Sequence, residues 1–371
     1  MDRFNCKMRV LLDGSVEVVD PTPEDLPLLQ EIDPDYRIRI APLQGFKRPR
    51  FQELRRWKIP ILEKELLNVD TSTLKNLHEA EMLKIEDFEQ KPCDTFSNDS
   101  SNLLDLKIEI SRRKLITCNL CGRGCRVNRL VGETGYCGLD ADAYVGGTFI
   151  HIAEEPPINP SLLVELYGCG MRCKFCQKSE LLEIKKSRRL DGYLWEDLDP
   201  SKARSLTFIG GNPDESVYSI LRFLKAAPDD FDLPIVWNCN GYGNIVTYKI
   251  LEGTVDVYIP DLKYGNDKCA AKWSGITGYV KKAHDCIAEM ANQNVPVFVR
   301  MLVLPGHSKC CHIPSIHFLK RYADSISLNL MDQYHPEFSL SEPEGPMSGS
   351  PEAKEIWQIL DEAKRAGLKL I

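Results

Sequence analysis

The chain has 371 residues, of which 43% are hydrophobic and 27% are charged, and its formal net charge is −7. This is the composition of an ordinary water-soluble globular protein, and it has no excess of basic residues for general nucleic-acid or membrane-surface binding. No apolar run approaches the roughly 20 residues that a membrane-spanning helix needs. These properties argue against a membrane-spanning protein and against a general nucleic-acid-binding protein.

The cysteine content is high, at 14 residues, and the first residues, Met1-Asp2-Arg3-Phe4-Asn5-Cys6, lack the apolar segment of a signal peptide. We therefore expect a cytoplasmic protein that has no membrane partner. In that compartment cysteines stay reduced, so they are expected to serve as metal ligands and not as a disulfide framework.

Residues 1–110 are predicted to form an N-terminal extension that ends in a polar linker, and we identify no catalytic motif in it. The expected elements are a hairpin of Met8–Leu12 and Val16–Val19 with a turn at Asp13-Gly14, helices at Phe51–Trp57 and Ile61–Leu67 separated at Pro60, and a linker over residues 86–102.

Residues 111–150 are predicted to form a cysteine-rich metal-binding module. Its four cysteines are Cys118, Cys121, Cys125 and Cys137, and the glycines between them allow tight turns. Zinc and an auxiliary iron–sulfur cluster both suit four thiolates. The C-x2-C spacing gives a slight preference for zinc. The remaining cysteines show no clear pattern: Cys6, Cys93, Cys269, Cys286, Cys310 and Cys311. We interpret Cys310-Cys311-His312 as loop sequence.

Residues 151–371 alternate short apolar runs with amphipathic segments, which predicts strand–helix units, a parallel sheet and an α/β fold. The expected strands are Leu162–Tyr167, Leu206–Ile209, Ile235–Cys239, Val255–Ile259, Val297–Leu304 and Ile326–Leu330, and the expected helices include Glu215–Ala226, Asn244–Leu251, Tyr279–Asn292 and Ala353–Ala366. In such folds, ligands gather at the carboxyl ends of the strands.

Three cysteines follow the first of these strands in a C-x3-C-x2-C arrangement: Cys169, Cys173 and Cys176. Three thiolates on one tight loop can hold three irons of a [4Fe–4S] cluster. The next cysteine is Cys239, so the fourth iron is left open to a ligand that is not protein. An open metal position is typical of a catalytic site.

Polar residues follow the second and third strands. Gly210 and Gly211 allow a close backbone approach to a ligand, whose ammonium group their carbonyls can bind, and Asn212 follows them. Asn238 and Asn240 end the third strand, where their amides can bind a ligand or simply form a turn.

Charged residues lie at the ends of the next two strands. Asp261 and Lys263 are spaced two apart, so they point to the same side of an extended chain, either into a ligand site or as a surface ion pair. Arg300 lies inside an apolar strand, where it needs a carboxylate partner. That partner is either a ligand or a carboxylate of the chain itself.

The three-cysteine loop, with Phe175 directly before its last cysteine, resembles the signature of the radical S-adenosylmethionine (SAM) superfamily. Over about residues 115–340 the chain is similar to the pyruvate formate-lyase activating enzyme-like, or PflX-type, branch. The resemblance also rests on Gly132–Cys137, Glu154–Ile158, Asn240–Tyr242, Tyr258–Tyr264, Leu302–Gly306 and Asn329–Tyr334.

This resemblance implies a partial (β/α)6 barrel in which Cys169, Cys173 and Cys176 hold the cluster and SAM binds the open iron. It also implies that Phe175 contacts the adenine and that the Gly210–Pro213 turn binds the SAM amino group, with Asn212 in place of the usual glutamate. Asp261, Lys263 and Arg300 would serve the SAM carboxylate, and Asp261 and Lys263 would also contribute to a cation site.

The implied activity is reductive cleavage of SAM to a 5′-deoxyadenosyl radical, which takes hydrogen from a peptide, RNA or small-molecule substrate. A flavodoxin or ferredoxin would supply the electron. The alternatives are an activase that acts on a glycine of a glycyl radical enzyme, and a non-enzymatic iron–sulfur electron-transfer protein.

Overall fold

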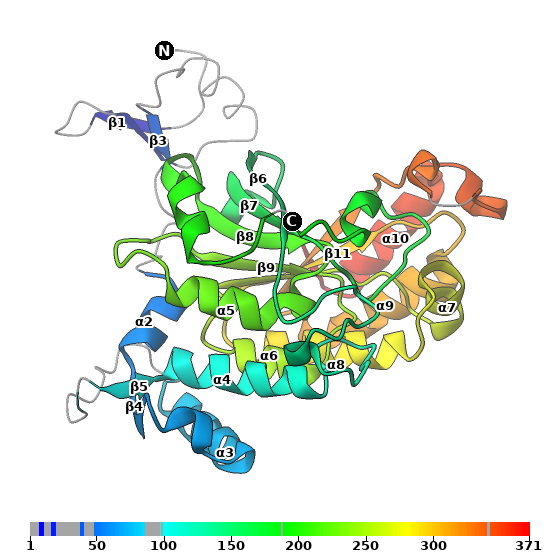
Figure 1. The fold of residues 1–371 in the computed structure, drawn as a ribbon. Coiled ribbons are helices and arrows are strands. Elements are labelled where there is room, and N and C mark those ends of the chain that lie inside the picture. The colour runs from blue at the N-terminus through cyan, green and yellow to red at the C-terminus, as the bar shows by residue number, and fades with distance from the viewer. Residues whose placement is uncertain are drawn as a thin grey trace.

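The computed structural model describes residues 7–10, 16–19, 38–40, 48–85, 97, 99–186, 188–339 and 342–371. Most of the described chain forms one large sheet with helices packed on its outer side (Figure 1). Among the described residues, none of the helices has the length and apolarity needed to cross a bilayer.

The central sheet has eight strands in the order β13-β12-β11-β10-β9-β8-β7-β6. All neighbouring pairs are parallel except β6 and β7, which are antiparallel. The strands are β6 (Val145–His151), β7 (Ser161–Leu166), β8 (Ser205–Gly210), β9 (Ile235–Cys239), β10 (Val257–Pro260), β11 (Val297–Leu302), β12 (Ile326–Met331) and β13 (Lys369–Leu370). The six predicted strands and the α/β class are therefore confirmed, whereas β6 and β13 were not predicted.

The connections between the parallel strands contain the expected helices and two that the sequence did not predict. The helices are α5 (Val217–Lys225), α6 (Ile245–Leu251), α7 (Asp267–Ser274), α8 (Tyr279–Ala291), α9 (Ile313–Leu319) and α10 (Ala353–Arg365), and α9 is preceded by the π-helical turn η8 (Ser308–His312). The unpredicted helices are α7 and α9. The main hydrophobic core lies between these helices and the strand side chains that face them.

The concave side of the sheet is filled at its amino end by the loop over residues 152–160. Ile158 from this loop packs against Val236, Val257, Ile259 and Phe298 in a separate buried cluster. These strand residues alternate with residues of the main core, as the period of two along a strand requires. The loop therefore closes the amino end of the partial barrel, and its carboxyl end is left for a ligand.

The N-terminal region contains the predicted hairpin and one of the two predicted helices. Strands β1 (Lys7–Val10) and β2 (Val16–Val19) pair antiparallel, and β3 (Ile38–Ile40) pairs with β2; the Asp13-Gly14 turn lies outside the described residues. Helix α2 (Arg50–Arg56) confirms the first predicted helix.

The predicted helix at Ile61–Leu67 is wrong, because β4 (Lys58–Leu62) pairs with β5 (Ser100–Asn102), in the segment that we expected to be a linker. Pro60 is tolerated because a two-stranded sheet has only edge strands. Most of the predicted linker, residues 86–96 and 98, lies outside the described residues.

Helices α3 (Thr71–Lys84) and α4 (Leu103–Ile116) connect the N-terminal region to the sheet domain. Asn102 starts α4 with a capping box. Its side chain accepts a hydrogen bond from the backbone N–H of Asp105, and the Asp105 carboxylate accepts one from the backbone N–H of Asn102. Helix α4 packs against α5 and α6 and forms a further layer below them (Figure 1).

A buried carboxylate, Asp256, joins α2 to the sheet. It accepts hydrogen bonds from the backbone N–H of Arg50 (3.1 Å) and of Ile235 (2.7 Å). Burial raises the pKa of Asp256 to about 7, and these hydrogen bonds oppose the rise only in part. In the unfolded chain the pKa returns to about 3.9. Between these values the folded protein keeps a proton that the unfolded chain has lost, so the free energy of unfolding falls as the pH rises.

We predict that Asp256→Asn removes this pH dependence. Between pH 5 and pH 7.5 the stability advantage of the parent over the variant should shrink by up to about 3 kcal/mol, as measured by denaturant unfolding under anaerobic conditions. Exposed Asp324→Asn is the matched control. Parallel pH profiles for the parent and Asp256→Asn would contradict the prediction.

Candidate functional site

The three cysteines of the predicted cluster loop lie directly after β7, at the carboxyl edge of the sheet. The Cys169 thiol is buried, and it accepts hydrogen bonds from the Met171 N–H (3.4 Å) and from Nδ2 of Asn240 (3.3 Å). Burial raises the pKa of Cys169, Cys173 and Cys176. Donors aimed at the sulfur stabilise it as a thiolate once a metal replaces the proton.

Helix α7 forms one wall of this loop. The backbone N–H groups of Lys174 and Arg172 donate to the carbonyls of Trp273 (2.8 Å) and Ser274 (3.2 Å), and Oγ of Ser274 donates to Sγ of Cys173 (3.0 Å). The loop that carries the cysteines is therefore fixed at its middle by the carboxyl end of a helix that the sequence did not predict.

The two glycines of the Gly210–Pro213 turn are required by a close approach to protein backbone. A Cβ at Gly211 would lie 2.1 Å from the carbonyl oxygen of Gly168, and one at Gly210 would lie 2.4 Å from the amide nitrogen of Leu166. Their tight packing against β7 and the start of the cysteine loop is a structural reason for these glycines, and the predicted contact of their carbonyls with the SAM amino group stays a prediction.

Asn212 is buried, and both ends of its amide are occupied by the protein. Its Oδ1 accepts from the N–H of Asn240 (2.9 Å), and its Nδ2 donates to the carboxylate of Glu215, which also accepts from the N–H of Gly170 (2.6 Å). Asn212 therefore positions Asn240, which in turn contacts Cys169. The predicted contact of Asn212 with SAM stays a prediction.

Glu215 was missed in the sequence, although it lies only three residues after Asn212. It is buried beneath the cysteine loop, and this burial, with the negative charge of Asp214 next to it, raises the pKa of Glu215 to about 7. An acidic residue this close to the Gly-Gly turn is the only sequence signal for it. Its contact with the Gly170 N–H fixes the start of the loop.

Asp261 and Lys263 lie just after β10 and form an ion pair, with Nζ of Lys263 2.6 Å from Oδ2 of Asp261. The two side chains therefore point to the same side, as their spacing predicted. Although burial raises the pKa of Cys173 and Cys176, the positive charge of Lys263 acts in the opposite direction on both. The pair thus borders the cysteine loop, where the predicted SAM carboxylate would lie.

Arg300 is paired with two glutamates of the chain itself. Its Nε donates to Glu155 (2.7 Å), and its Nη2 donates to Glu155 (2.8 Å) and to Glu154. The side chain of Glu155 is 0% exposed and that of Arg300 is 12% exposed. The structural ion pair, one of the two alternatives for Arg300, is therefore present, and the predicted contact of Arg300 with the SAM carboxylate stays a prediction.

Asn238 lies on the concave face of β9, two residues after Val236 of the concave cluster. It is 7% exposed, and its Nδ2 is a buried donor that has no hydrogen-bond partner in the described part of the chain. Unpaired buried donors are costly, so a bound group with an acceptor oxygen or nitrogen would satisfy it. Asn240 also forms a turn, accepting from the Tyr242 N–H at 2.8 Å.

Phe175 lies in an aromatic cluster beside the last cysteine of the loop. Its ring centroid is 6.1 Å from that of Tyr334 and 6.5 Å from that of Tyr264, both in edge-on contacts. The ring is buried and held in place by these neighbours. A rigid aromatic surface of this kind suits the predicted adenine contact, which stays a prediction.

The cysteine-rich module packs directly on the cluster loop. A Cβ at Gly170 would lie 2.7 Å from Oε1 of Glu215 and 3.0 Å from Sγ of Cys121, so the two cysteine sets are tightly packed at this glycine. Arg123 of the module donates to the carbonyls of Gly170 (2.7 Å) and Gly275 (2.7 Å), and it stacks on Tyr136. The module therefore covers one side of the loop.

The two cysteine sets share one charged neighbour, Glu215. Burial raises the pKa of both Cys169 and Cys121, and the negative charge of Glu215 raises both further. Cys173 adds a smaller rise to the pKa of Cys169, and the thiols of Cys137 and Cys118 add one to the pKa of Cys121. Within the described residues, no three ligand atoms of either set lie within 4.8 Å of one another.

The residues present fit a cluster with SAM in four respects: three thiolates on one loop, donors to two of their sulfurs, a buried unpaired donor at Asn238, and an adjacent ion pair. Cys239 is not a fourth ligand, because it faces the helix side of the sheet and accepts from the Tyr248 hydroxyl (3.5 Å). The open iron position predicted from the sequence is thus compatible with the fold.

The chain resembles several known proteins. Residues 161–271, which include all three loop cysteines, match the family model of a 4Fe-4S single cluster domain. Among solved structures it is similar to SuiB of Streptococcus suis bound to S-adenosylmethionine (13% identity, TM-score 0.40, 55% of this chain and 48% of that chain). It is also similar to a radical SAM methyltransferase from Sphaerobacter thermophilus (14% identity, TM-score 0.40, 57% of this chain and 65% of that chain). The chain spans about half the length of the SuiB chain.

Among curated proteins, the chain is 30% identical over 291 residues to the uncharacterized protein MJ0674 of Methanocaldococcus jannaschii. The match covers 75% of this chain and 83% of the relative. With this identity over most of both proteins, the chain belongs to the same family as MJ0674.

Proposed function

We propose that this protein is a radical SAM enzyme that acts directly on a substrate. The observation that carries the proposal is the placement of Cys169, Cys173 and Cys176 after β7, on a loop fixed from both sides, with an unpaired amide at Asn238 on the concave face. When bound, the cluster and SAM would supply a 5′-deoxyadenosyl radical that takes a hydrogen atom from the substrate.

The residues of the chain hold and orient the reactants. Asn240 and Ser274 donate to the sulfurs of Cys169 and Cys173 and so stabilise their thiolates. Asp261 and Lys263 would receive the charged amino-acid part of SAM, and the ring of Phe175 would pack on its adenine. The loop over residues 152–160 closes the amino end of the barrel and would keep water from reaching the reacting atoms by that route.

The cysteine-rich module is proposed to hold an auxiliary iron–sulfur cluster. The spacing of its thiols supports this over our initial preference for zinc. Thiolates that bind one tetrahedral zinc at about 2.3 Å lie about 3.8 Å apart, and no three of these cysteines come within 4.8 Å of one another in the described chain. Cys118, Cys121 and Cys137 are buried beside the loop, where a flavodoxin or ferredoxin would deliver electrons through this module.

A direct test is electron paramagnetic resonance of the anaerobically reconstituted and reduced protein, with and without SAM, together with measurement of 5′-deoxyadenosine. We expect a [4Fe–4S] signal that changes when SAM is added, and release of 5′-deoxyadenosine. A cluster signal that is indifferent to SAM, without 5′-deoxyadenosine, would overturn the enzyme proposal in favour of electron transfer.

A further inference from the structure

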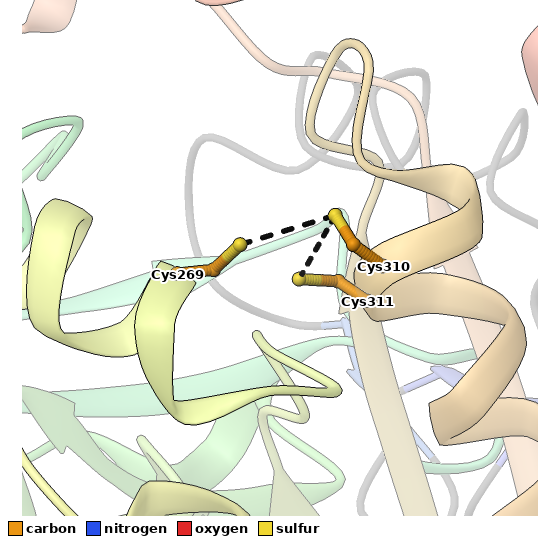
Figure 2. Close-up of side chains that lie close together, drawn as sticks. All are labelled: Cys269, Cys310 and Cys311. Atoms are coloured by element: carbon orange, nitrogen blue, oxygen red, sulfur yellow. Dashed lines mark hydrogen bonds between the residues drawn. The ribbon is translucent and has the colours of Figure 1, made fainter.

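Three cysteines that showed no pattern in the sequence come together at a third place in the fold. Cys269 lies in the first turns of α7, and Cys310 and Cys311 lie in η8, before α9. Figure 2 shows their side chains pointing toward one another from the two helical segments. Sγ of Cys310 is 3.9 Å from Sγ of Cys269 and 3.9 Å from Sγ of Cys311, and all three sulfurs lie within 4.8 Å of one another.

These distances fit thiolates that share a single ion. Thiolates bound tetrahedrally to one zinc, with bonds of about 2.3 Å, lie about 3.8 Å apart. In the described chain this is the one group of three or more cysteine, histidine or acidic residues that converges so closely. We propose that Cys269, Cys310 and Cys311 form a mononuclear site for a thiophilic d10 cation, Zn²⁺ or Cu⁺.

The side-chain amide of Asn266 contacts two of these sulfurs. Asn266 caps α7, because its Oδ1 accepts from the Cys269 N–H at 2.8 Å. Its Nδ2 lies 3.3 Å from Sγ of Cys269, 3.5 Å from Sγ of Cys311 and 2.6 Å from the Cys310 carbonyl oxygen. One amide therefore touches all three cysteines and ties α7 to η8. Donors of this kind orient ligands and balance the negative charge of bound thiolates.

The turn that carries two of the ligands is itself unusual. Short π-helical segments are rare and are often found at functional sites, and η8 sets the sulfurs of consecutive residues 3.9 Å apart. Gly265 permits the close approach of the two segments, since a Cβ there would lie 2.3 Å from the Cys311 carbonyl oxygen. The packing of the backbone, and not chance side-chain contact, thus brings the thiols together.

The site is accessible from solvent and leaves one coordination position free. Cys310 is exposed, and Cys269 also lines an adjacent cavity of about 480 Å³, together with Trp273 and His307. His307 does not supply the fourth ligand, because its Nε2 accepts from Nε1 of Trp273 (3.0 Å) and its Nδ1 lies 2.8 Å from the Pro305 carbonyl oxygen. Water or a small thiol would complete the coordination.

Binding of the cation releases protons. Thiolates, and not thiols, are the ligands of Zn²⁺ and Cu⁺. A divalent or monovalent cation displaces the thiol protons as the metal–sulfur bonds form, with no change of oxidation state. Affinity should therefore rise with pH.

The test uses the full chain after its iron–sulfur sites have been reconstituted, so that the other two cysteine sets are filled. Zn²⁺ and Cu⁺ are titrated separately under anaerobic conditions, with competing chelators and elemental analysis. Co²⁺ provides a thiolate charge-transfer spectrum. Outer-shell changes alone cost about 10–100-fold in metal affinity. Loss of two ligands in Cys269→Ser/Cys310→Ser should therefore lower it by about 100-fold or more.

Cys286→Ala is the matched control, because it removes a buried cysteine of α8 outside the group. We expect the parent and this control to bind one more equivalent of Zn²⁺ or Cu⁺ than the double variant. Equal stoichiometry in all three proteins would overturn the proposal, and so would a Cys269–Cys310 disulfide in the anaerobic parent. Circular dichroism of each variant separates loss of a ligand from loss of the fold, and the SAM response of the first cluster reports the proposed function separately.

Discussion

Replacing Cys169 with alanine is expected to abolish the SAM-responsive cluster signal and to lower the release of 5′-deoxyadenosine by about 100-fold or more. Cys169 is the most buried of the three loop thiols, and its sulfur accepts hydrogen bonds from the Met171 N–H and from Nδ2 of Asn240. Loss of this thiolate would leave one iron of the proposed cluster without its protein ligand and two donors without an acceptor. Iron content, electron paramagnetic resonance and product release measure the effect.

The paired control is Cys125→Ser in the cysteine-rich module. Cys125 is partly exposed, and its sulfur accepts from the Tyr136 N–H at 3.3 Å. This variant should reduce the iron content but keep a cluster signal that responds to SAM. If Cys125→Ser removed the SAM response while Cys169→Ala retained it, the assignment of the two cysteine sets would be reversed.

Replacing Arg300 with methionine is expected to lower the free energy of unfolding by about 3–5 kcal/mol, the usual cost of breaking a buried ion pair from one side. The change leaves Glu154 and Glu155 buried without their cation, although Nδ2 of Asn329 still donates to Glu155 (2.9 Å). Burial raises the pKa of Glu154, but His151 and Arg300 together hold it below its usual value. Anaerobic denaturant unfolding at neutral pH measures the loss.

Lys281→Met is the control for the removal of a cation, because Lys281 pairs with Asp285 on the exposed side of α8. Surface pairs contribute about 0–1 kcal/mol, so little change is expected there. Unfolding together with SAM binding to the same variants tests the two roles considered for Arg300. A weaker affinity for SAM with unchanged stability would contradict the structural ion pair and restore the SAM clamp.

Most of the sheet could be predicted because buried parallel strands are short apolar runs, and the alternation of these runs with amphipathic helical segments is visible in the sequence. Strand β6 was missed because Gly146 and Gly147 weaken its pattern, yet Gly146 is needed where a Cβ would lie 2.5 Å from the Leu181 side chain. Helix α7 was missed because it is short and polar, Asp267–Ser274. The predicted helix at Ile61–Leu67 was wrong because the pairing of β4 with β5 outweighs the local helix propensity.

The site was predictable where its residues are close in sequence, and unpredictable where they are not. The cysteine loop and the Asp261–Lys263 pair lie within short motifs. The partners of Arg300 are about 145 residues away, and Cys269 is 41 residues from Cys310, so no local pattern connects them. Glu215 had a local signal, but its role depends on the fold of the loop above it.

The loop over residues 152–160 has a consequence for the shape of any substrate. Because Ile158 packs against Val236, Val257, Ile259 and Phe298, the amino end of the barrel is filled. A substrate could then reach the cysteine loop from the carboxyl end of the strands or past the open edges of the sheet at β6 and β13. A peptide or RNA that used either route would bring only a short segment to the loop, and passage along the barrel axis is blocked at Ile158.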